Sequence, residues 1–129
     1  MDIDVDLSED FNRGLIEPAL AYDMNGMTID DIEKMVLDGK MQFWAIRNGS
    51  MLAGAVTGVN NLFGQKVLII VALGGGDMDK WLEEFLATME DYAELMECKR
   101  IVAYGREGWT RVGKLYGWEY AFTAIKKEI

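Results

Sequence analysis

The sequence predicts an α+β fold with a mixed, mostly antiparallel sheet. Strand-like segments follow one another through short turns between residues 41 and 73, which is typical of an antiparallel meander. A long amphipathic helix pattern then separates the last of these segments from another strand-like segment, and this arrangement is typical of a right-handed parallel crossover. A chain of 129 residues has the length of one domain, so we expect a single domain over residues 1–129.

The N-terminal part predicts one strand and two helices. The first seven residues alternate aspartate with aliphatic side chains, and this period of two indicates a strand with an acidic face. Ser8 is the expected N-cap of a helix that runs to about Met24 and is kinked or restarted at Pro18. Thr28 is the expected N-cap of a second helix, which ends at Gly39.

The middle of the chain predicts the meander. Its three strands are expected at residues 41–47, 51–59 and 66–73. Asn48-Gly49 between the first two predicts a type I′ turn, and residues 60–65 are expected to form a loop. The third strand is a run of Val, Leu and Ile, which is typical of a strand buried on both faces, and we expect it to stop at Gly74.

The C-terminal part completes the order β-α-α-β-β-β-α-β-α-β. A long helix is expected from about Asp77, because apolar residues recur at helical spacing up to Met96. A strand at residues 101–104, a short helix at 108–115 and a final strand at 118–125 follow.

Composition excludes several classes of site. The chain has no histidine and one cysteine, Cys98, so a Cys/His zinc site, a Ser-His-Asp triad and a disulfide framework are ruled out, and we predict no metal site. Cys98 precedes Lys99 and Arg100, which would lower the pKa of a reactive thiol, but the favoured interpretation is a buried structural thiol. The N-terminus shows no secretory signal and no segment is apolar enough to span a membrane, so we expect a cytoplasmic protein.

The formal net charge of −9 indicates which partners suit the surface. A strongly acidic surface repels nucleic acid phosphates and anionic membranes. It attracts a basic protein surface or a cationic amine substrate, although the simpler interpretation is that the charge keeps a small protein soluble. A homodimer stays open as an assembly state.

Three consecutive glycines, Gly74 to Gly76, lie directly between the buried strand and the long helix. Glycines at such a joint let a phosphate approach the backbone N–H groups of a helix N-terminus, although a plain strand exit explains them equally well. The element order resembles the GCN5-related N-acetyltransferase (GNAT) superfamily over almost the whole chain. The resemblance implies a six- to seven-stranded sheet with helices on both faces and a strand at 101–104 that splays from its neighbour. It also implies acetyl-CoA as cofactor, held by Leu73, Gly74, Gly75, Gly76, Asp77 and Met78.

The sequence departs from the GNAT pattern at two places. The family's pyrophosphate loop usually reads Gln/Arg-x-x-Gly-x-Gly/Ala, whereas Asp77 and Asp79 follow the glycines here. We expect these carboxylates to cap the helix, where they would oppose a bound pyrophosphate unless Lys80 or a metal ion offsets them. The family often carries a catalytic Tyr four residues before a Gly-Phe pair; the matching pair here is Gly117-Trp118, and Gly113 stands at the position of the Tyr.

Other residues of the predicted cleft are candidates for chemistry or recognition. The resemblance places Tyr104 and Glu107 where they could transfer protons, and packing is the alternative role for the phenol. Arg106, Trp109 and Arg111 are the predicted partner or ligand contact, and helix capping with core coverage is the alternative. The same stretch also resembles small GNAT-like proteins encoded by tailed bacteriophages.

Two functions follow from these observations. The favoured one is a non-catalytic, protein-binding or virion-associated role for a phage-encoded protein with a degenerate acyl-CoA site, located in the host cytoplasm or the virion. The alternative is an active N-acyltransferase that moves an acetyl group from acetyl-CoA to a cationic amine.

Overall fold

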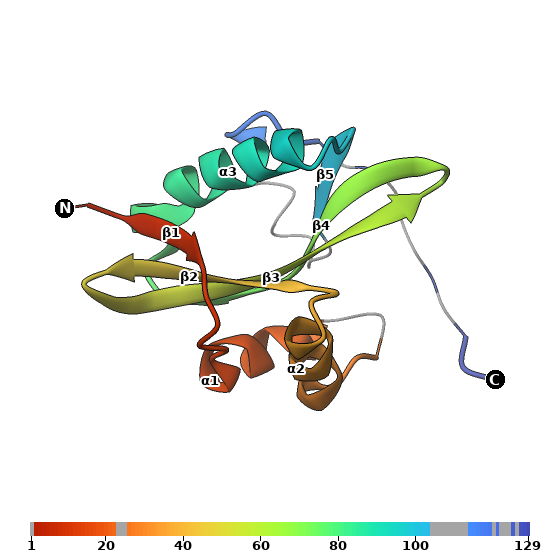
Figure 1. Cartoon of the computed structure of the whole chain (residues 1–129), viewed down its shortest axis with the longest axis horizontal. Coiled ribbons are helices and arrows are strands. Elements are labelled where there is room, and N and C mark those ends of the chain that lie inside the picture. The colour runs from red at the N-terminus through yellow and green to blue at the C-terminus, as the bar shows by residue number, and fades with distance from the viewer. Residues whose placement is uncertain (1, 23–25, 104–113, 120, 122–124, 126) are drawn as a thin grey trace.

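The computed structural model describes residues 2–22, 26–103, 114–119, 121, 125 and 127–129. Within these residues, one sheet has the strand order β1-β2-β3-β4-β5, with α3 on one face and α1 and α2 on the other (Figure 1). The elements are β1 (Asp4–Leu7), α1 (Arg13–Ile16), the 3-10 helix η1 (Glu17–Tyr22), α2 (Ile29–Leu37), β2 (Gln42–Asn48), β3 (Ser50–Leu62), β4 (Gln65–Gly75), α3 (Met78–Leu95) and β5 (Arg100–Ala103).

Strand pairing confirms the α+β class and the mixed sheet. β1 to β4 pair antiparallel in chain order, and β5 pairs parallel with β4 after the crossover through α3. Helices cover both faces, as expected, but the predicted count of six to seven strands is wrong for the described residues, which form five. None of the helices in the described ranges is both long and apolar enough to cross a membrane.

The predicted C-terminal strand accounts for the difference in strand number. Trp118, Glu119, Ala121 and Ile125 belong to no strand, and the other residues of 118–125 lie outside the described part of the chain. The sequence pattern shows which residues can share a face, whereas a strand also needs a neighbouring edge to pair with. The predicted helix at 108–115 is described only from Lys114, which is helical.

The first predicted helix is divided in two, and it starts later than expected. Asn12 is the N-cap of α1, because its Oδ1 accepts a hydrogen bond from the Leu15 N–H at 3.2 Å. Ser8 instead accepts a bond from the Asp10 N–H at 3.1 Å and closes a local turn. The chain continues as η1, in which Pro18 marks the predicted restart.

Two hairpin turns differ from the sequence prediction. Asn48-Gly49 does form a hairpin, but only Gly49 has a positive φ (78°), so the turn is not type I′. The expected loop at 60–65 is a longer hairpin: β3 continues to Leu62, and a two-residue turn is made by Phe63 (φ 53°) and Gly64 (φ 79°). Phe63 was not recognisable as a turn residue, because bulky side chains rarely adopt positive φ.

The capping of α2 is confirmed. The Thr28 hydroxyl accepts a hydrogen bond from the Asp31 N–H at 3.2 Å, and the Asp31 carboxylate accepts one from the Thr28 N–H at 3.0 Å. Hydrogen bonding of the Asp31 carboxylate to Thr28, first to its backbone N–H and then to its side chain, lowers the pKa of the Asp31 carboxyl. Arg13 then ties α1 to α2, with 2.8 Å bonds to both Asp30 and Glu33.

The sheet separates two hydrophobic layers. The layer beneath α3 consists of Trp44, Ile46, Ala53, Ala55, Leu68, Ile70, Trp81, Leu82, Phe85, Met89 and Ala93. The layer against α1 and α2 consists of Ile16, Ile29, Ile32, Phe43, Ala45, Val56 and Ala72. Alternate side chains of β2, β3 and β4 enter opposite layers, which explains why these strands read as nearly continuous apolar runs.

Gly74→Ala should destabilise the fold, whereas Gly76→Ala should not. A Cβ on residue 74 would collide with the Leu15 carbonyl oxygen, which is backbone and cannot rotate away, so we expect a loss of about 1–3 kcal/mol or more. Residue 76 has no atom within 4 Å of such a Cβ and no positive φ, so its Ala variant should change stability by less than about 1 kcal/mol. Urea denaturation of both variants measures this difference, and equal stabilities would contradict the close packing of α1 on β4.

Candidate functional site

Among the described residues, the C-terminal end of β4 is paired on one edge only. β3 pairs with β4 along its whole length, but β5 pairs only with Val67 to Ile70. From Val71 to Gly75, no strand of the described residues lies on the β5 side of β4. The splay of β5 from β4 stays a prediction, because the residues that follow Ala103 lie outside the described part of the chain. A strand edge with no strand beside it leaves backbone N–H and C=O groups without a ladder partner.

A β-bulge begins this unpaired stretch. Val56 faces Ala72 and Thr57 faces Ile70, so Val71 is an extra residue in β4. A bulge increases the local twist and turns the strand, and bulges are common beside active sites for this reason. The bulge was not predicted, because a continuous run of β-branched and aliphatic residues gives no local sign of one.

The N-terminus of α3 lies directly after this edge. Asp77, at the N-cap position, has left-handed backbone angles (φ 54°, ψ 41°), and its side chain makes no capping hydrogen bond. The prediction that Asp77 caps the helix with its carboxylate is therefore wrong, because this conformation turns the side chain away. The Lys80 N–H bonds to the Asp77 carbonyl oxygen at 2.9 Å, but the first N–H groups of a helix have no acceptor within it.

Trp81 holds the turn between β4 and α3. Its indole N–H donates to the Gly76 carbonyl oxygen at 2.7 Å, and the residue is 1% exposed. Trp81 belongs to the apolar pattern that predicts the long helix, but periodicity cannot show that the polar edge of the indole also fixes the turn. The indole therefore couples the core beneath α3 to the backbone at the candidate site.

The three glycines have different roles. Gly74 and Gly75 are within β4, so the strand does not stop at Gly74 as expected. A Cβ on Gly74 would meet the Leu15 carbonyl, and Gly75 has φ 133° and would press a Cβ against Ala53. Gly76 has open space around it. Two of the glycines are therefore required by packing, and Gly76 is the one that leaves backbone accessible.

The charges at this turn are exposed. The Asp77 carboxylate lies 3.9 Å from the Lys80 ammonium, with side chains 67% and 53% exposed. An exposed pair of this kind stabilises the fold little, because water and salt screen it. Lys80 nevertheless offsets part of the negative potential that Asp77 and Asp79 would present to an anionic ligand.

The proton-transfer candidates Tyr104 and Glu107, and the predicted contact residues Arg106, Trp109 and Arg111, lie outside the described residues, as does Gly113. Their roles stay predictions. In the described stretch 114–119, Tyr116 is 37% exposed, and Trp118 packs against the layer beneath α3. No group of three or more Asp, Glu, Cys or His side chains that could hold a metal ion occurs among the described residues.

Cys98 has the character of a structural thiol. It is partly buried, and this burial raises the pKa of its thiol, with a smaller opposing effect from the Lys66 ammonium. The shift is opposite to the one that a neighbouring pair of basic residues would cause in a reactive cysteine. Cys98 is therefore no candidate nucleophile.

Solved structures of acetyltransferases share this fold. The aminoglycoside acetyltransferase AAC(6')-Iy in complex with the bisubstrate analogue CoA-S-monomethyl-acetylneamine matches with a TM-score of 0.74 and 9% identity, over 100% of this chain and 99% of that one. Glucosamine-6-phosphate N-acetyltransferase from Arabidopsis thaliana matches with a TM-score of 0.69 and 13% identity, over 99% of both chains. A GCN5-related N-acetyltransferase from Ralstonia eutropha matches with a TM-score of 0.64 and 18% identity, over 78% of this chain and 72% of that one.

No family model matches the sequence, and no curated protein matches it either. The likeness is therefore one of structure. It establishes a GNAT-like fold, and confirms the fold that the element order implied.

Alkylation of Cys98 should be slow. Because only the thiolate attacks, a raised pKa leaves less nucleophile at pH 8 than in a free cysteine, whose pKa is about 8.5. We expect iodoacetamide to react more slowly with the folded protein than with glutathione, and Lys66→Gln to slow the reaction further. Lys114→Gln removes the same charge elsewhere and should leave the rate unchanged. A rate above that of glutathione would restore Cys98 as a reactive thiol.

Proposed function

We propose that this protein is an acyl-CoA-dependent N-acyltransferase whose cofactor site is the unpaired end of β4 and the N-terminus of α3. The observation that carries the proposal combines two features of the described residues: no strand pairs with Val71 to Gly75 on the β5 side, and Asp77 makes no side-chain cap at the N-terminus of α3. The first arrangement suits the amides of a pantetheine arm, and the second suits a diphosphate. The bound acyl-CoA would supply the activated thioester.

The chain's own groups would act mainly by orientation. Gly76 lets the diphosphate approach the backbone, and Trp81 holds that backbone in place through its bond to the Gly76 carbonyl. A backbone N–H on the free β4 edge would donate to the thioester carbonyl oxygen and stabilise charge there during attack. The cationic amine would first lose a proton, and its nitrogen would then bond to the carbonyl carbon as the C–S bond breaks. The nitrogen would lose a second proton, and the leaving thiolate would take one up. Tyr104 and Glu107 stay the proposed proton-transfer residues.

The acceptor would be a cationic amine, because the net charge of −9 favours a positive substrate. The negative charge would favour the approach of a cationic amine to the protein surface, but it does not define a pocket that binds the amine. The solved structures of the same fold include one with a bisubstrate analogue that joins CoA to an acetylated amine, which supports this class of reaction for the fold.

The second candidate is a non-catalytic, protein-binding module, as the resemblance to bacteriophage proteins implies. Asp77 and Asp79 favour it, because two carboxylates stand where a diphosphate would bind, and so does Gly113 in place of a catalytic tyrosine. Its partner would be a basic protein surface. An oligolysine peptide that binds in a salt-dependent manner, together with no binding of CoA, would favour this function over the first.

Calorimetric titration with CoA and acetyl-CoA tests the proposal. We expect saturable binding by the wild type and at least about tenfold weaker binding by Gly76→Val, because the added side chain covers the accessible backbone. Asp77→Asn tolerates the left-handed backbone and removes a repulsive charge of roughly 1 kcal/mol, so it should tighten binding by about fivefold.

Asp38→Asn is the matched control for the charge change. It removes one carboxylate at the C-cap of α2, away from the candidate site, and should leave CoA affinity unchanged. Absence of acetyl-CoA binding at millimolar concentration would reject the acyltransferase proposal.

A further inference from the structure

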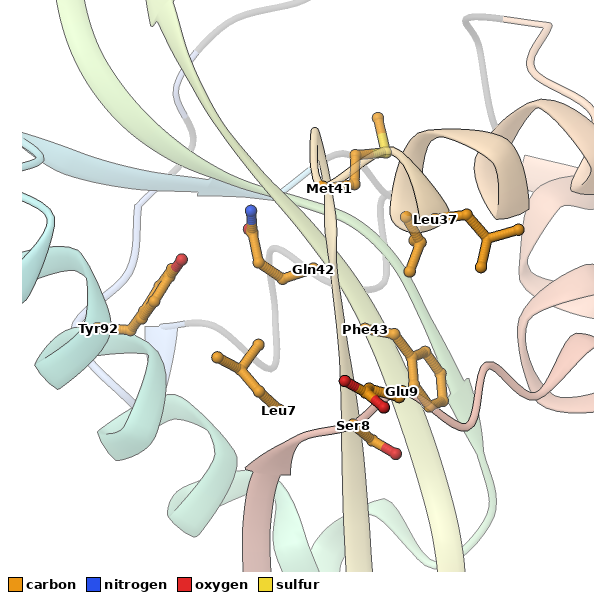
Figure 2. Close-up of a pocket in the computed structure, with 10 residues that line it drawn as sticks. Leu7, Ser8, Glu9, Leu37, Met41, Gln42, Phe43 and Tyr92 are labelled. Carbon is orange, nitrogen blue, oxygen red and sulfur yellow. The ribbon is translucent and has the colours of Figure 1, made fainter.

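A pocket opens at the edge of the sheet where β1 ends, away from the β4 edge (Figure 2). Its volume is about 680 Å³, and it is open to solvent. Four elements contribute to it: the end of β1 with the segment that follows, the C-terminal end of α2, the start of β2, and α3. The lining residues that matter for recognition are Leu7, Glu9, Leu37, Met41, Gln42 and Tyr92.

A directional hydrogen-bond chain orients the polar group of this pocket. The Trp44 indole N–H donates to the Thr57 hydroxyl oxygen at 2.8 Å, and the Thr57 hydroxyl donates to Gln42 Oε1 at 2.9 Å. Thr57 is completely buried, and these two hydrogen bonds satisfy its hydroxyl group. The Gln42 carbonyl oxygen is therefore already hydrogen-bonded, and the NH₂ group of the same amide has no acceptor among the described residues. Gln42 consequently presents hydrogen-bond donors to the pocket.

Apolar side chains line the pocket on both sides of β2. Figure 2 shows Leu7, Gln42 and Tyr92 on one side of β2, and Leu37 and Met41 on the other. The Tyr92 ring packs edge-on against Trp44, with ring centroids 5.0 Å apart, which holds the wall of the pocket in place. Leu7 is 54% exposed and Leu37 76% exposed, so both offer apolar surface that the fold leaves uncovered.

The chemistry of the lining defines one class of ligand. The Gln42 donors need a carbonyl acceptor, and the leucine surfaces need aliphatic groups. The Glu9 carboxylate at the pocket disfavours an anion. A ligand that contacts both Gln42 and Leu37 must pass over the edge of β2, and an extended peptide has that shape. We propose that this pocket binds an uncharged, extended peptide segment with an aliphatic side chain, whose backbone carbonyl accepts from Gln42.

Titration with the capped peptide acetyl-Ala-Leu-Ala-amide, followed by ¹⁵N NMR, tests this site. We expect saturable shifts of the Gln42 side-chain NH₂ and Trp44 indole signals, because the two groups are joined through Thr57. Gln42→Glu keeps an oxygen acceptor for Thr57 and removes the donors, so it should weaken binding by about fivefold or more. Acetyl-leucine-amide, which is too short to cross the edge, should bind more weakly than the tripeptide.

Two leucines of equal exposure provide the matched variants. Leu37→Ser should weaken binding by about fivefold, whereas Leu95→Ser, also at a position 76% exposed but on α3 and absent from the pocket lining, should leave it unchanged. Both positions are solvent-exposed, so neither variant should unfold the protein.

The site is rejected if the Gln42 NH₂ signals do not shift at about 20 mM peptide, which is roughly 20-fold above a Kd of about 1 mM, or if Leu37→Ser binds as well as the wild type. Equal affinity for acetyl-leucine-amide would reject the extended peptide as occupant. Because the titration contains no CoA, its result is independent of the β4 site.

Discussion

The close approach of α1 to the end of β4 is the constraint on which the candidate site depends. The Leu15 carbonyl oxygen occupies the space that a side chain on residue 74 would need, so only glycine lets the helix lie so near the strand. The same contact places the buried Ile16 in the layer between α1 and the sheet. Arg13 then joins α1 to α2 through two carboxylates, so both helices keep their places over one face.

The other face of the sheet meets the same turn through Trp81. Its ring is buried beneath α3, while its N–H holds the Gly76 carbonyl, so the start of α3 is fixed by packing and by one hydrogen bond together. Helix N-termini usually receive a side-chain cap. Here the residue at that position, Asp77, is in a left-handed conformation and leaves the helix end uncapped. A helix end without a side-chain cap from Asp77 therefore follows the part of β4 that is paired on one edge only among the described residues.

The two proposed sites differ in the groups that they offer to a ligand: backbone groups at the β4 edge and a side-chain amide at the β1 edge. At the β4 site, no described strand pairs with residues 71–75 on the β5 side, Gly76 has open space around it, and the Asp77 carboxylate is exposed. At the β1 edge, the Gln42 carbonyl oxygen accepts a hydrogen bond from the buried Thr57 hydroxyl, so the NH₂ group of the same amide is left for a ligand. The two sites lie at different edges of the sheet, so occupation of one leaves the other accessible. The net charge of −9 favours neutral or cationic ligands at the β1 edge, whereas a diphosphate at the β4 site would have to bind against this charge.

The sequence by itself determined the α+β class, the antiparallel meander, the crossover through a long helix, the capping of α2 by Thr28 and the place of the glycine joint. These features are local, since periodicity, caps and glycines express them within a few residues. Only the tertiary structure decided which glycine stays accessible, that Asp77 does not cap α3, where Val71 bulges and how far β5 pairs. It also decided that the residues of 118–125 that are described join no strand. Each of these depends on contacts between residues distant in sequence, such as Leu15 with Gly74, and no local pattern records such contacts.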